Sequence, residues 1–296
     1  MTSSPAEEPT SRSGIGNGRR PGTIPADDQE IDFRKYIDGA AVLGAAANVI
    51  MQLASPGVGY GVLESPVDSG NLTKHPVKRT RTTLTYLAVA MLGTEPERIA
   101  YRRAVDTSHR QVRSTAQSPV RYNAFDRNLQ LWVAACLYWG ARDLRDRMRG
   151  AIDPEIQAAI YRNSARLGTT LQVPPDMWPA DEDAFDRYWA ENLARTKIDP
   201  PVREMLDEIV DLRMFPRPVQ LLGARFNRWV TAGLLPPHLR EEMRMRWSDR
   251  DERRFARMLR VLGRVSSVLP TALRCFPINA YLLDFRIRRK LGMKLV

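Results

Sequence analysis

Histidine and cysteine are scarce in this chain, and their scarcity limits the metal and redox chemistry that its 296 residues can support. There are three histidines and two cysteines, and neither Cys136 nor Cys275 belongs to a Cys-x-x-Cys pair. Zinc-binding and thioredoxin-like chemistry are therefore unsupported. Because both cysteines lie in apolar contexts, we expect buried thiols in a reducing compartment and predict a cytoplasmic protein.

Long apolar runs are also missing. The most apolar stretch, AAVLGAAANVIMQLA at residues 40–54, is shorter than the roughly 20 residues of a membrane-spanning helix, so it predicts a buried helix. No segment alternates with period two, whereas helical periodicity is found almost throughout. The sequence therefore predicts an all-α fold, a single compact domain of about ten helices over residues 32–296. Residues 1–31, rich in Ser, Pro, Gly and charge, predict a disordered tail.

Positive charge is abundant: 45 Lys and Arg against 34 Asp and Glu give a formal net charge of +11. Such a surface attracts phosphates, carboxylates or an anionic membrane. The C-terminal YLLDFRIRRKLGMKLV fits peripheral membrane contact or, alternatively, a solvated helix end. One hypothesis is thus a non-enzymatic protein that binds an anionic membrane or nucleic acid. Its basic residues are scattered over many helices rather than gathered on one recognition helix, so we expect no nucleic-acid partner.

Capping and stop signals divide the chain into helices. The first helix is predicted from Phe33 to about Ala54, ended by Pro56 and the glycines of PGVGYGV. A second helix should close at Gly93, and the following TEPE is a capping box that opens a third helix, extending to about residue 112. Four later helices are expected to begin after aspartate N-caps, at Asp126, Asp153, Asp181 and Asp199.

His109 raises the main functional question. On the helix opened by the capping box it shares a face with Tyr101 and Val105, so its imidazole is expected to point inward. An inward histidine is either hydrogen-bonded in the core or a ligand. His75 and His238 lie in polar loops, so no second inward histidine supports a zinc or di-iron site. Haem differs, because one histidine can hold its iron.

Three blocks of the sequence stand out in order: PVKRTRTTLTYLAVAMLGT, VDTSHRQVR and YNAFDRNLQLWVAACL. Together they resemble the rubber-oxygenase, or mpaB-type, catalytic-domain family, which includes latex-clearing protein. The resemblance implies an all-helical oxygenase that holds b-type haem through one histidine on a central helix, and it makes His109 that proximal ligand. The implied partners are dioxygen and a small hydrophobic, isoprenoid or lipid-like substrate. A haem b-dependent oxygenase is the leading hypothesis.

The resemblance also implies roles for other residues. The family's distal pocket has an arginine, a lysine and a threonine, and the matching positions here are Arg79, Thr82 and Thr83. A threonine in place of the lysine offers a neutral hydroxyl instead of a charged amine, so different distal chemistry is expected. Glu64 matches a glutamate that has been given a base role, or else is a solvated loop residue. Arg113 is assigned to a haem propionate, or to an ion pair with Asp106.

Overall fold

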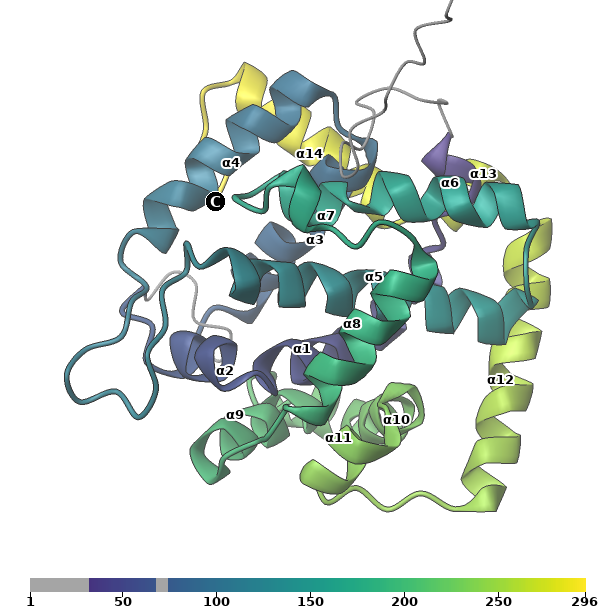
Figure 1. Cartoon of the computed structure of the whole chain (residues 1–296). Coiled ribbons are helices and arrows are strands. Elements are labelled where there is room, and N and C mark those ends of the chain that lie inside the picture. The colour runs from purple at the N-terminus through teal and green to yellow at the C-terminus, as the bar shows by residue number, and fades with distance from the viewer. Residues whose placement is uncertain (1–31, 68–73) are drawn as a thin grey trace, which may run out of the picture.

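Helices make up the regular structure of the residues that the computed structural model describes, 32–67 and 74–296. Their only strand-like pairing is an isolated bridge between Arg113 and Asn123, so the predicted all-α class is confirmed. The predicted tail, residues 1–31, lies outside the described residues. Figure 1 shows the α-helices, which are α1 (Ala45–Leu53), α2 (Pro56–Leu63), α3 (Pro76–Leu92), α4 (Glu95–His109), α5 (Arg127–Arg149), α6 (Pro154–Ser164), α7 (Arg166–Thr169), α8 (Glu182–Ala194), α9 (Pro200–Val210), α10 (Arg217–Leu234), α11 (Pro237–Glu242), α12 (Asp249–Val268), α13 (Thr271–Arg274) and α14 (Ile278–Lys290).

Several helices begin where a side chain accepts hydrogen bonds from the first backbone N–H groups, which have no partner within the helix. The predicted capping box is confirmed, since the Glu97 carboxylate accepts from the Thr94 N–H at 2.8 Å. Aspartate caps also start α5, α6 and α8 as predicted, at Asp126, Asp153 and Asp181. Asp199 occupies the N-cap position of α9, but its carboxylate accepts from the Tyr60 hydroxyl instead, at 3.1 Å.

The predicted first helix, residues 33–54, is wrong as a continuous helix. Two 3₁₀ segments, η1 (Phe33–Lys35) and η2 (Gly39–Gly44), precede α1. The Asp38 carboxylate accepts from the Ala40 N–H at 3.0 Å and starts a new turn there. A Cβ on Gly39 would lie 1.6 Å from the Phe276 carbonyl oxygen, so this position fits only glycine. A contact with residues far along the chain thus sets the break.

The glycine-rich residues 56–62, predicted to interrupt helical structure, form most of α2. Pro56 lies in its first turn, where the missing N–H of proline removes no intrahelical hydrogen bond. A Cβ at Gly59 would lie 2.5 Å from the Leu53 carbonyl oxygen and 3.2 Å from the Val202 side chain. The glycines therefore let α2 pack closely on α1 and α9, and this packing outweighs their low helix propensity.

Helix α5 crosses the middle of the molecule (Figure 1) and contributes much of the larger hydrophobic core. It packs against α1, α7, α10 and α12. The indoles of Trp132 and Trp139 both stack on Trp189 of α8, with ring centroids 5.1 and 4.8 Å apart. Cys136 lies between them in the sequence and is buried, as is Cys275, and both thiols are free as predicted.

A second core lies where α14 packs against α3 and α4. The Tyr101 ring meets the edge of Phe285 with centroids 5.8 Å apart. At the start of α4, the buried Glu97 carboxylate accepts two hydrogen bonds from Arg286 of α14, at 2.8 and 3.2 Å. The buried residues of this core are Leu84, Ala88, Val89, Tyr101, Ile278, Leu282 and Phe285.

Helix α12 approaches α5 closely at Gly263. A Cβ at this position would lie 2.1 Å from the Met148 carbonyl oxygen, a backbone atom that cannot move away as a flexible side chain could.

Within residues 32–67 and 74–296, no single helix has both the length and the apolar character to cross a membrane. One bent pair, Gly39–Leu53 with Pro56–Leu63, meets both requirements when joined across its 107° bend.

Candidate functional site

His109 is the last residue of α4, so the prediction that this helix extends to about residue 112 is wrong. The chain turns here because the backbone of residues 112–114 pairs with the segment before α5. The Ala124 N–H donates to the Val112 carbonyl, and the Ser114 N–H donates to the Tyr122 carbonyl, both at 2.9 Å. His109 therefore lies half-buried at a helix end.

The His109 ring lacks a partner that a buried imidazole normally has. Its Nδ1 atom is buried and makes no hydrogen bond with the described residues. The edge of the Phe125 ring lies against it, with centroids 6.1 Å apart. Burial, followed by the positive charge of Arg79, lowers the pKa of His109 to about 4, while Asp106 acts in the opposite direction. The ring is therefore neutral at neutral pH and keeps a lone pair on one nitrogen.

The other two histidines differ from His109 in their surroundings. The Nε2 atom of His238 lies 3.1 Å from the Thr196 carbonyl oxygen, within hydrogen-bonding distance. His75 is exposed and occupies the N-cap position of α3. Of the three histidines, only His109 has a buried ring nitrogen without a hydrogen-bond partner among the described residues.

The predicted distal residues lie along one stripe of α3, because Arg79, Thr82 and Thr83 are separated by three and four positions. Arg79 is exposed at its position on α3, and partial desolvation by the surrounding protein lowers the pKa of its guanidinium. The guanidinium forms no hydrogen bond or ion pair with the described residues. The positive charge of Arg79 contributes to the lowered pKa of His109.

Thr82 and Thr83 differ in what their hydroxyls can reach. The Thr82 hydroxyl donates to the Arg79 carbonyl of its own helix at 2.9 Å. The Thr82 carbonyl accepts from the Tyr101 hydroxyl at 2.6 Å, which ties α3 to α4. Thr83 is exposed and one position further round the helix. Thr82, at the position where the resemblance implies a lysine, thus donates its hydroxyl hydrogen bond within α3.

Glu64 follows α2 and holds a loop rather than facing His109. Its carboxylate accepts hydrogen bonds from the Ser118 hydroxyl at 2.6 Å and the Tyr122 hydroxyl at 2.7 Å. Burial, the hydrogen bond to Glu64 and the Glu64 charge raise the pKa of Tyr122, with Ser118 opposing them. No contact links Glu64 to the His109 ring among the described residues.

Arg113 lies in the loop after α4, where its backbone forms the bridge to Asn123 and its side chain is exposed. The alternative pairing with Asp106 is not found. Asp106 accepts instead from Gln172 Nε2 at 2.6 Å, and the Gln172 side-chain oxygen accepts from Gln130 Nε2 at 2.6 Å. Arg113 is therefore a free cation of the loop among the described residues.

Sequence reasoning missed two groups beside this site. The first is the Asp106–Gln172–Gln130 chain, which ties α4 to α5 through the turn after α7. The second is Tyr86, whose hydroxyl donates a hydrogen bond to the Leu167 carbonyl. Tyr86 lies seven residues after Arg79, so helical spacing could have placed it on the same stripe. Nothing local in the sequence signals the glutamine pairing.

The side chains of this site fit a cofactor whose metal needs a single protein nitrogen, rather than a metal ion held by several side chains. No three His, Cys, Asp or Glu side chains gather as a metal-ligand set in the described part of the chain. Haem iron can be held by a single neutral histidine.

A hollow of about 670 Å³ lies beside α5, α6 and α8, and another of about 350 Å³ lies beside α13 and α14. Neither is lined by His109 or Arg79.

Comparison with known proteins agrees with the three blocks described above. Residues 33–264 match the family described as ER-bound oxygenase mpaB/B'/rubber oxygenase, catalytic domain. Two uncharacterised proteins, one from Mycobacterium bovis and one from Mycobacterium tuberculosis, are each 52% identical over 251 residues, covering 85% of this chain and 98% of theirs. No solved structure matches the chain. The match spans α3, α4 and α5, and the chain belongs to the family of mpaB-type and rubber oxygenase catalytic domains.

Proposed function

We propose that this protein is a haem b-dependent oxygenase that uses dioxygen on a hydrophobic, isoprenoid or lipid-like substrate, with His109 as the residue that would hold the iron. The observation that carries the proposal is the buried Nδ1 atom of His109, which has no hydrogen-bond partner among the described residues. An unpaired buried polar atom costs free energy unless a partner binds there. Family membership supplies the oxygenase class, and this nitrogen supports the cofactor.

The surroundings of His109 suit ligation. Metal ligation requires neutral imidazole, and burial with the nearby Arg79 charge keeps the pKa of His109 at about 4. Protons therefore do not compete for the ring at neutral pH. Phe125 packs against the ring and limits its rotation. Tyr101 fixes the distance between α4 and α3 through its hydrogen bond to Thr82, so the histidine and the distal stripe keep their relative positions.

When bound, haem supplies the iron chemistry that activates dioxygen, while the protein sets ligation, polarity and access. In this proposal Arg79 provides positive charge on the distal side, and Thr83 provides a hydroxyl. We propose that Thr82 has a different role from the lysine of the family, because its hydroxyl hydrogen-bonds to the Arg79 carbonyl within α3. Arg113, exposed and unpaired among the described residues, is available for a propionate.

Glu64 has a weaker claim to a chemical role. Two hydrogen bonds hold its carboxylate on the loop that precedes α5, and a base must be free to accept a proton from a substrate. We therefore propose Glu64 as a residue that positions this loop.

The two free, buried thiols support a reducing compartment such as the cytoplasm.

Absorption spectra of the purified protein, with and without added haemin, test the proposal. We expect a Soret band that His109→Ala abolishes or strongly shifts, whereas His75→Ala and His238→Ala retain it. Far-UV circular dichroism of each variant checks that the fold is intact. Identical spectra for all four proteins would make the ligand assignment wrong, and no Soret band after haemin addition would make the cofactor wrong.

Thr82→Lys provides a separate test of the distal side. A lysine amine near the iron should change its spin state or its affinity for added ligands such as imidazole. Thr80→Lys, two residues earlier and roughly 200° round the same helix, serves as the matched control. An unchanged spectrum in Thr82→Lys would place this position away from the iron.

A further inference from the structure

The C-terminal surface of the chain combines exposed apolar side chains with positive charge. We define this surface as the exposed residues from the end of α12 through α13 and α14 to the C-terminus. Its most exposed apolar members are Val268 at 81%, Leu273 at 62%, Phe276 at 62% and Leu291 at 66%. Side chains this exposed gain little hydrophobic stabilisation from folding, and apolar side chains gathered on one surface are typical of an interaction site.

The charge of the same surface is strongly one-sided. Residues 264–296 contain one acidic side chain, Asp284, and it is paired with Arg288 at 2.8 Å. Seven basic residues lie in this segment: Arg264, Arg274, Arg286, Arg288, Arg289, Lys290 and Lys294. Arg34 and Lys35 of η1 are exposed beside α13, where the Arg274 guanidinium donates to the Lys35 carbonyl. A partner for this surface must therefore be both negatively charged and apolar.

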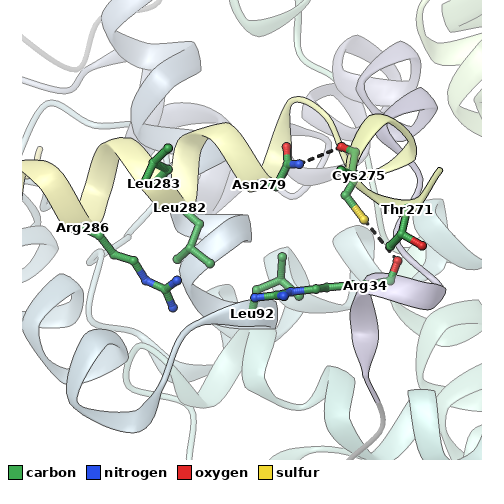
Figure 2. Close-up of a pocket in the computed structure, with 9 residues that line it drawn as sticks. Arg34, Leu92, Thr271, Cys275, Asn279, Leu282, Leu283 and Arg286 are labelled. Atoms are coloured by element: carbon green, nitrogen blue, oxygen red, sulfur yellow. Dashed lines mark hydrogen bonds between the residues drawn. The ribbon is translucent and has the colours of Figure 1, made fainter.

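A hollow of about 350 Å³ opens within this surface (Figure 2). Its walls are mainly apolar, formed by Leu92, Leu282, Leu283 and Ala272. The Arg34 and Arg286 side chains extend into it from two sides. The Arg286 guanidinium donates to the Glu97 carboxylate, but its side chain remains 42% exposed. Because a guanidinium can donate five hydrogen bonds, it has further donors for a ligand. An apolar hollow with two cations at its edge suits the glycerol and phosphate region of a phospholipid.

We propose that this C-terminal surface docks on an anionic lipid bilayer. On the outer face of α14, Leu283 and Ile287 alternate with Arg286 and Lys290, so apolar groups can enter the interface while cations reach lipid phosphates. The proposal does not depend on haem, since no residue of the His109 site belongs to this surface. Docking would place the protein at the lipid bilayer, in which hydrophobic substrates of the kind proposed above dissolve.

Vesicle cosedimentation of the full-length protein tests the docking. We expect binding to vesicles of phosphatidylcholine with about 30% phosphatidylglycerol, and at least about tenfold weaker binding to pure phosphatidylcholine. Binding should weaken as sodium chloride rises from about 0.1 to 0.5 M, because salt screens the charges. Equal binding to both vesicle types would overturn the proposal.

Paired variants locate the surface. Arg289→Glu with Lys290→Glu, and separately Val268→Ser with Leu273→Ser, should each reduce the partition coefficient about tenfold or more. The matched control is Leu221→Ser with Leu222→Ser, two α10 residues that are 83% and 86% exposed. If only the control lowers binding, the docking surface is α10 and the proposal is wrong. It is also wrong if the C-terminal variants convert a dimer to a monomer without changing vesicle binding.

Discussion

Lowering the pH to about 5 should destabilise the cofactor-free protein through His109. The pKa of this ring is about 4 in the folded protein against the ordinary 6.5. Between these values the unfolded chain binds more protons, so stability rises with pH across this window and falls as the pH drops through it. At about pH 5 the difference amounts to roughly 2 kcal/mol, and water around a half-buried ring reduces it to roughly 1 to 2 kcal/mol.

Urea unfolding at about pH 7.5 and pH 5, in the protein and in His109→Gln, measures this effect. Glutamine keeps a polar side chain but does not titrate, so the variant should lack the part of the pH dependence that His109 supplies. The comparison of four unfolding free energies cancels any general effect of the substitution. An equal loss of stability in both proteins would refute the argument, because it would mean that the ring is protonated as easily in the folded as in the unfolded chain.

Three further predictions concern contacts between helices. Gly263→Ala should lower stability by about 1 to 3 kcal/mol, because its Cβ meets the Met148 carbonyl, and thermal unfolding measures it. Arg286→Gln should destabilise the protein most above the usual pKa of Glu97, because that buried carboxylate loses its ion pair; urea midpoints at about pH 7 and pH 4 show this. Trp189→Leu should remove about 1 to 3 kcal/mol and the near-ultraviolet dichroism of the stacked indoles.

Helix starts were predictable where the controlling residues are close in sequence. The capping box joins Thr94 to a residue three positions later, and Asp126 accepts from the N–H groups of Asn128 and Leu129, two and three positions later. Such contacts form within one turn and depend little on the rest of the fold. For the same reason, the spacing of His109 from Tyr101 was enough to predict that its ring turns toward the protein, where its Nδ1 atom is buried.

Features set by distant residues were not predictable. Helix α2 forms in spite of its glycines because Gly59 packs on Val202, and α4 stops because residues 112–114 pair with residues 122–124. Glu97 was readable as a cap, but its ion pair with Arg286 spans 189 positions. Contacts at this separation depend on how whole helices pack, which a single sequence does not specify.

The C-terminal helix limits how this protein can be divided. The region that matches the family ends at residue 264, yet Leu282 and Phe285 of α14 complete the core above Tyr101. Removing the last 32 residues would therefore uncover apolar side chains of α3 and α4 and leave Glu97 without its counterion. A form truncated at residue 264 would therefore be expected to aggregate rather than persist as an independent unit.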